Sequence, residues 1–114
     1  VYADQCASCH GANLEGQPDW RRRGPDGRLP APPHDESGHT WHHGDQLLFD
    51  YTKYGGAAVM QAMGLDGATS GMPGFADTLT DAEIRDVLAF IRAQWSPRIQ
   101  AIQADRTRAE AAAR

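Results

Sequence analysis

The chain has 114 residues and a formal net charge of −4 at pH 7, from 15 acidic and 11 basic side chains. This length accommodates one domain, and the acidic balance argues against a general nucleic-acid-binding protein, which presents a clustered basic face. The sequence contains no apolar run of about 18 residues and so predicts no transmembrane helix. Its two cysteines form at most one disulfide, which excludes a disulfide-scaffold protein.

The first third of the chain is rich in loop signals. Residues 1–5 show no signal-peptide pattern, so we expect that an export signal has been removed or that the N-terminus has been trimmed. Residues 2–9 are compatible with a short helix. Residues 11–34 contain repeated glycines and prolines and predict a long loop, which in a small domain needs something to hold it.

Two helices are predicted in the middle of the chain. Residues 45–54 carry an apolar face at helical spacing, and the glycine pair that follows ends the helix. Residues 57–63 are small and apolar and predict a second, shorter helix. Residues 64–74 are again a glycine-rich loop.

The strongest helix signal begins at Thr80. The run Thr80-Asp81-Ala82-Glu83 is a capping box, in which the two end side chains satisfy each other's backbone amides. An apolar stripe follows at helical spacing: Ile84, Val87, Leu88, Ile91 and Trp95. Ser96-Pro97 ends this helix and can start another, so we expect residues 98–114 to be helical near the proline and to fray toward the C-terminus.

The sequence as a whole predicts an all-α fold of three to five helices with long loops, because no stretch alternates as a strand and nothing repeats. We expect one domain over residues 1–96 and a helical or frayed extension over residues 97–114. Apolar side chains are few for so much loop. A stable core therefore requires a large apolar ligand to complete it.

Cys6-Ala7-Ser8-Cys9-His10 is a C-x-x-C-H motif, the attachment signature of haem c. Two thiols one helical turn apart add to the two vinyl groups of a haem, and the histidine places its imidazole under the iron. A redox-active or zinc-binding C-x-x-C is less favoured, because the chain lacks a strand–helix–strand unit and a second cysteine pair. One covalent haem c would also supply the apolar faces that the core needs.

The sixth iron ligand has several candidates: Met60, Met63, Met72, His34, His39, His42 and His43. Met72 is favoured because it stands in a Gly-Met-Pro-Gly-Phe segment just before the strongest helix. The glycine before it permits close backbone approach, the proline after it stiffens the chain, and Phe75 can pack at the haem edge. Met60 and Met63 are expected to fill gaps in the core.

With these motifs in this order, the chain resembles the mono-haem class I cytochrome c family over roughly residues 2–96. That family has an N-terminal helix with C-x-x-C-H, a long loop, a middle helix, a Met-Pro loop and a long C-terminal helix. The resemblance implies that His10 and Met72 are the axial ligands of a haem held by Cys6 and Cys9. Thioether ligation favours ferrous iron and raises the reduction potential.

The resemblance also implies that a loop proline carbonyl accepts the Nδ1 proton of His10 and fixes the orientation of the ring. Pro33 or Pro32 matches this position, and Pro25 is a weaker candidate. The loop that carries them is longer here than in many relatives.

Two further groups of residues are candidates around the haem. Arg28 and the run Trp20-Arg21-Arg22-Arg23 either neutralise the haem propionates or form a solvated basic loop. The segment 34–43 holds four histidines, two carboxylates and Trp41. It either binds copper, nickel or zinc, or is a loop in which Trp41 and one histidine hydrogen-bond the propionates.

The sequence therefore predicts an electron carrier rather than an enzyme: a monomer that exchanges single electrons with redox proteins. We expect it in a bacterial periplasm, because haem attachment takes place outside the cytoplasm. The rival interpretations are a five-coordinate haem enzyme or gas sensor, and a metal-handling protein that uses the 34–43 segment. Acidic residues outnumber basic ones over residues 34–95, which either steers a positively charged partner or forms a solvated helix surface.

Overall fold

The computed structural model describes residues 2–18, 20–22, 31–63 and 72–113. Over these residues the fold is helical without strands, which confirms the predicted class. Six α-helices are present rather than three to five, because the N-terminal helix is two single turns that meet at Cys6 and because the C-terminal extension forms a helix of its own. The elements are α1 Tyr2–Gln5, α2 Ala7–His10, the 3₁₀-helix η1 Thr40–His42, α3 Asp45–Tyr54, α4 Gly56–Ala62, α5 Asp81–Ala93 and α6 Pro97–Ala112. None of the helices in the described ranges is both long and apolar enough to cross a bilayer.

Helix α5 begins and packs as its sequence predicts. The Thr80 hydroxyl accepts the amide of Glu83 at 3.1 Å, and the Glu83 carboxylate accepts the amide of Thr80 at 2.9 Å. Four side chains of the predicted stripe are buried: Ile84, Val87, Ile91 and Trp95. Leu88 is only half-buried, because it lines a groove between α3 and α5.

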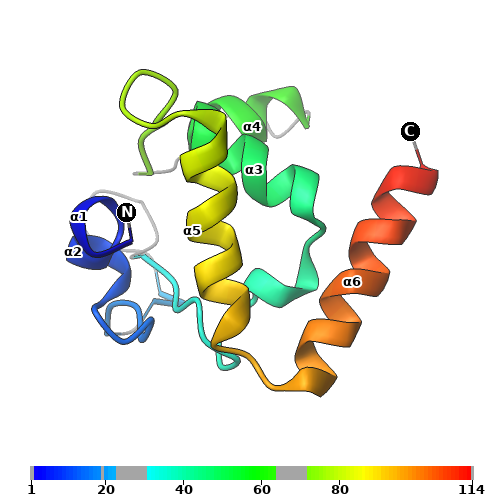
Figure 1. Ribbon diagram of the computed structural model, residues 1–114. Coiled ribbons are helices and arrows are strands. Elements are labelled where there is room, and N and C mark those ends of the chain that lie inside the picture. The colour runs from blue at the N-terminus through cyan, green and yellow to red at the C-terminus, as the bar shows by residue number, and fades with distance from the viewer. Residues whose placement is uncertain (1, 19, 23–30, 64–71, 114) are drawn as a thin grey trace.

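The core joins the two ends of the described chain. Tyr2 of α1, Leu14 of the following loop and Ile99 of α6 are buried in one cluster with the α5 stripe. Tyr2 also lies against Phe90, with ring centroids 5.4 Å apart, and its hydroxyl donates to the Gly11 carbonyl at 2.7 Å. In Figure 1, α1 and α2 lie on one side of α5, and α3 and α4 lie on the other. The helical turns that carry the C-x-x-C-H motif are thus fixed against α5.

The segment 72–76, which we call the return segment, runs along the C-terminal end of α3. The amide of Phe75 donates to the carbonyl of Thr52 at 3.0 Å, and the amide of Gly56 donates to the carbonyl of Met72 at 3.1 Å. Gly74 permits this approach, because a Cβ at that position would lie 2.7 Å from the backbone of α3. The backbone of Met72 is therefore held by the junction of α3 and α4.

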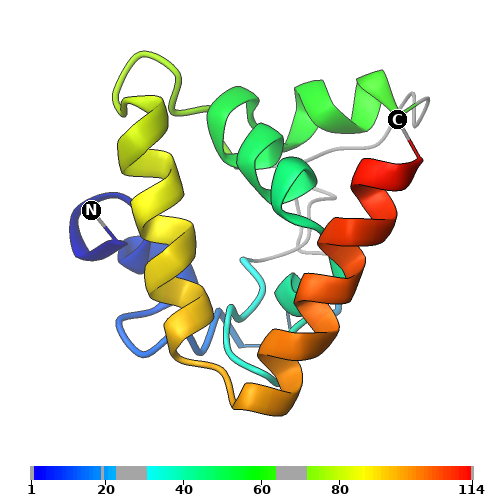
Figure 2. The same ribbon diagram turned by 45° about the vertical axis from the view of Figure 1, so that its right-hand side comes forward.

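Helix α6 supplies the N-terminal cap of α3. The residue before α3 is Gly44, which has no side chain to cap the helix. The carboxylate of Glu110 instead accepts the amides of Gln46 and Leu47, at 2.9 and 3.0 Å. The hydroxyl of Thr107 accepts the amide of the first residue of α3 at 3.1 Å. Figure 2 shows α6 alongside this end of α3. Three of the four free amides that a helix N-terminus leaves are thereby satisfied from another helix.

Gln103 fixes the middle of α6 to the N-terminal end of α3. Its side chain is 1% exposed, and its Nε2 donates to the His43 carbonyl at 3.1 Å and to the Asp45 carboxylate at 2.8 Å. Residues 97–112 therefore form a helix that docks on the rest of the protein.

Replacing Glu110 by alanine is expected to lower the free energy of unfolding by about 1.5 kcal/mol, the usual cost of losing a helix cap that also places a negative charge at the helix N-terminus. Denaturant unfolding of the haem-loaded protein measures this. Asp105→Ala on the same helix is the control: its carboxylate pairs with exposed Arg108, so the expected cost is below about 0.5 kcal/mol. Equal effects of the two substitutions would contradict the capping role.

Candidate haem site

The C-x-x-C-H motif lies on α2 and the turn before it. The amide of His10 donates to the Cys6 carbonyl at 2.9 Å, so the motif is one helical turn. Both cysteines are free thiols; Cys6 is half-buried and Cys9 is exposed. Burial raises the pKa of the Cys6 thiol. Two unpaired thiols on one turn, next to a buried imidazole, are the donor set that covalent haem attachment requires.

The imidazole of His10 is held by the loop that follows it. Its Nδ1 lies 2.7 Å from the carbonyl oxygen of Pro32. A carbonyl only accepts hydrogen bonds, so Nδ1 carries the proton and the lone pair is on Nε2, the atom that can bind a metal. Burial lowers the pKa of His10, which keeps the ring neutral, and the Pro32 bond opposes that shift.

The sequence analysis left Pro33 and Pro32 open as the partner of His10, and the structure corrects the choice of Pro33 to Pro32. Pro33 is fully buried, and its carbonyl instead lies 3.5 Å from the hydroxyl of Thr40. In extended backbone the carbonyls of neighbouring residues point in opposite directions. The carbonyls of Pro32 and Pro33 therefore meet different partners, His10 and Thr40.

The described part of the loop between α2 and η1 is fastened by backbone hydrogen bonds. The Leu14 carbonyl accepts the amides of His34 and Asp35, at 2.9 and 3.2 Å, and the amide of Gln17 donates to the Ala31 carbonyl at 2.9 Å. Leu14 adopts a left-handed conformation, with φ of 62°, and is buried in the core. These contacts hold the loop that the sequence predicted would need support.

His34 packs directly on the proximal histidine. The ring centroids of His34 and His10 are 4.0 Å apart. The Nδ1 of His34 lies 2.6 Å from the Thr40 hydroxyl, and its carbonyl accepts the indole N–H of Trp95 at 2.8 Å. Burial, followed by the neighbouring His10, lowers the pKa of His34 to about 3. Sequence analysis named His34 as a possible distal ligand and as a member of the histidine-rich segment 34–43; nothing local in the sequence indicates that it supports the proximal ligand.

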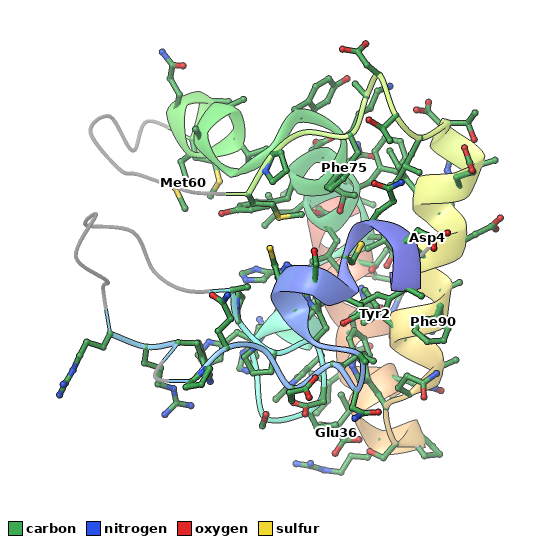
Figure 3. The ribbon with its side chains drawn as sticks, turned by 90° about the vertical axis from the view of Figure 1, so that its left-hand side faces the viewer. Tyr2, Asp4, Glu36, Met60, Phe75 and Phe90 are labelled. Atoms are coloured by element: carbon green, nitrogen blue, oxygen red, sulfur yellow. The ribbon has the colours of Figure 1, made fainter. Side chains whose placement is uncertain are left out.

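The methionine candidates lie on the other side of the site from α2. Met72 and Phe75 of the return segment and Met60 of α4 are half-buried. Figure 3 shows Met60 and Phe75 on the α3–α4 side, across from the N-terminal helices. Met63 is 58% exposed, so the expectation that it fills the core is wrong.

Arg28 and Trp41 were both predicted as candidates to contact the haem propionates. Arg28 lies outside the described residues. Trp41 is half-buried, and its one N–H donates to the Glu36 carbonyl at 3.0 Å. A propionate contact through this indole therefore requires that the Glu36 bond be given up.

The histidine-rich segment 34–43 does not assemble a metal site. Among the described residues, no three side chains of histidine, cysteine, aspartate or glutamate are placed to hold a metal ion. His39 and His42 instead stack on each other, with ring centroids 4.9 Å apart. The structure gives no support to the metal-handling alternative.

The residues present fit a covalent haem: two free thiols one turn apart, and a buried neutral imidazole with its Nε2 available. Bound there, a haem supplies an iron that gains and loses one electron. A family model described as cytochrome c matches residues 1–95, most of the chain. Comparison with curated proteins and with solved structures returned no match. The chain belongs to the cytochrome c family, whose members carry electrons on one covalently bound haem c.

Proposed function

We propose that this protein is a one-electron carrier whose haem is attached through Cys6 and Cys9, with His10 and Met72 as the axial ligands of the iron. The observation that supports it most is the hydrogen bond from His10 Nδ1 to the Pro32 carbonyl. It presents Nε2 as a neutral ligand in a fixed orientation, which raises ligand basicity and limits ring rotation.

Met72 is the proposed distal ligand because its backbone is anchored at the junction of α3 and α4 while its side chain is only half-buried. His34 is excluded from that role in this arrangement. A distal ligand binds on the far side of the iron from His10, whereas the His34 ring lies directly against the His10 ring. Met63 is largely exposed, which leaves Met60 as the competing sulfur.

An iron with two protein ligands is six-coordinate and low-spin, and it reorganises little when it changes oxidation state. That property suits a carrier and leaves no open position for peroxide, CO or NO. The proposed partners are redox proteins that donate and accept single electrons. The proposed compartment is a bacterial periplasm, where haem c is attached.

Replacing Met72 by alanine is expected to abolish the sulfur-to-iron charge-transfer band of the ferric protein. The reduction potential should fall by a few tenths of a volt, within the range of about 0.8 V that axial ligands span. The reduced variant should bind CO. Optical spectra and a potentiometric titration measure these effects.

Met60→Ala is the matched control, because it removes the competing sulfur from α4. It is expected to keep the band and the potential. Loss of the band in Met60→Ala alone would assign the distal ligand to Met60. A wild-type protein that is high-spin and binds CO would favour the five-coordinate enzyme or sensor.

A further inference from the structure

Four rings of the loop region contact one another in a row, one pair stacked, one tilted and one edge-on. The ring centroids of Trp41 and His42 are 3.9 Å apart, those of His42 and His39 are 4.9 Å apart, and those of His39 and Trp20 are 5.6 Å apart. Trp41 packs against the core cluster. His39 and His42 are exposed. The row therefore runs from the edge of the core to the solvent.

Trp41, the ring of this row that packs against the core, is connected through Thr40 to the proximal side of the haem site. The His10 ring contacts the His34 ring, and His34 lies 2.6 Å from the hydroxyl of Thr40, the residue before Trp41. Electrons tunnel through bonded and closely packed atoms more readily than across gaps. The described residues thus form one run of contacts from the iron ligand His10 to the exposed rings.

One arginine contacts the outer ring of the row, and a second follows it in the chain. The guanidinium of Arg21 lies 4.8 Å from the centroid of the Trp20 ring, and Arg22 beside it is exposed. Burial, then His39, then the charge of exposed Arg106 on α6 lower the pKa of His42, and Arg106 is also a minor cause of the lowered pKa of His43. We call Trp20, Arg21, Arg22, His39, His42 and Arg106 the aromatic–basic face.

Glu36, next to Trp41, and Glu110, which acts on His43, both use their carboxylates to accept backbone amides. Glu36 accepts the amide of Ser96, and Glu110 accepts two amides of α3. The three arginines of the aromatic–basic face come from before and after the acidic stretch of residues 34–95, and the residues that define the face include no carboxylate, whereas the chain as a whole has a net charge of −4. Such a face attracts and orients an acidic partner rather than the positively charged one that the acidic stretch suggested.

We propose that the aromatic–basic face is the docking surface for an acidic redox protein and that the row of rings couples that partner to the haem from the proximal side. This rests on the proposed electron-carrier function. One electron passes between the haem iron and the partner; the carrier is oxidised as the partner is reduced, and no bond or proton is transferred. Arginine charge and flat aromatic rings together are what a short-lived complex with an acidic protein requires.

The test uses the haem-loaded protein and two one-electron oxidants of opposite charge, hexacyanoferrate(III) and tris(phenanthroline)cobalt(III). Arg21→Gln with Arg22→Gln is expected to lower the rate constant for oxidation by hexacyanoferrate(III) about tenfold at low ionic strength. The rate with the cobalt complex should not fall. Arg85→Gln with Arg92→Gln carries the same change of charge on α5, away from the face, and should stay within about twofold of wild type.

A binding measurement separates docking from electron transfer. Hexacyanochromate(III), which is redox-inert and paramagnetic, should broaden the ring NMR signals of His39 and His42 in the ferrous protein. The broadening should persist in the α5 pair variant and disappear in the Arg21 and Arg22 pair variant. His39→Leu with His42→Leu keeps the arginines and should slow oxidation by hexacyanoferrate(III) at least several-fold, with the reduction potential unchanged.

Equal losses in the two arginine pair variants would overturn the proposal, because they would reflect net charge alone. Unchanged rates in the histidine pair variant would overturn the proximal route. Wild-type binding to phosphatidylglycerol vesicles, with equal oxidation rates in all variants, would also overturn it and assign the face to a lipid surface. A protein that does not cycle reversibly between ferric and ferrous iron would refute the carrier function itself, a result distinguishable from these.

Discussion

Alanine at both Cys6 and Cys9 is expected to abolish covalent haem attachment. The two thiols lie on one helical turn next to His10, and they are the protein's only cysteines. Acid–acetone extraction should remove all haem from the double variant and none from the wild type. Mass spectrometry should show the wild-type chain heavier by one haem. Because the core depends on that apolar ligand, the double variant should also lose cooperative unfolding.

Ser8→Ala is the control for this substitution, since the serine stands between the two cysteines and is exposed. It should retain the haem and the wild-type spectrum. Haem that stays attached in the double variant would show that the thioether bonds are formed elsewhere and would refute the site.

Replacing Trp95 by alanine is expected to lower the free energy of unfolding by about 4 kcal/mol, the typical cost of removing a large buried aromatic side chain. Trp95 is 5% exposed and lies in the core cluster, and its indole N–H donates to the His34 carbonyl. Trp95→Phe keeps a ring but leaves that carbonyl without its donor, for an expected cost of about 1–2 kcal/mol. Denaturant unfolding of the haem-loaded protein measures both.

Phe90→Ala on α5 is the matched control, five residues before Trp95. Phe90 is 44% exposed and contacts Tyr2, so its removal is expected to cost about 1 kcal/mol. A loss of less than about 1 kcal/mol for Trp95→Ala would show that the core does not depend on this residue.

The elements that sequence analysis predicted well are those with local signals. The bounds of α3 agree with the prediction, because an apolar face and a glycine pair define a helix without reference to the rest of the chain. The capping box at Thr80 and Glu83 likewise involves residues three apart. The C-x-x-C-H motif is local for the same reason, since it fits one turn of helix.

The contacts that sequence analysis missed join residues far apart in the chain. The partner of His10 is Pro32, 22 residues away, and choosing it over Pro33 depends on the path of the loop. The bond from Trp95 to His34 spans 61 residues. The candidate role of Arg28 stays a prediction because residues 23–30 lie outside the described ranges, and the role of Met72 as a ligand stays a proposal.

The cap that α6 provides for α3 has a consequence for the order of assembly. Glu110 lies 63 residues beyond Leu47, so α3 begins without a side-chain cap and receives one only when the last turns of α6 are in place. Contacts of such long sequence separation form late and slow the overall reaction. A nascent chain would thus expose its haem-attachment motif early, while α3 would receive its cap only after residue 110 had been made.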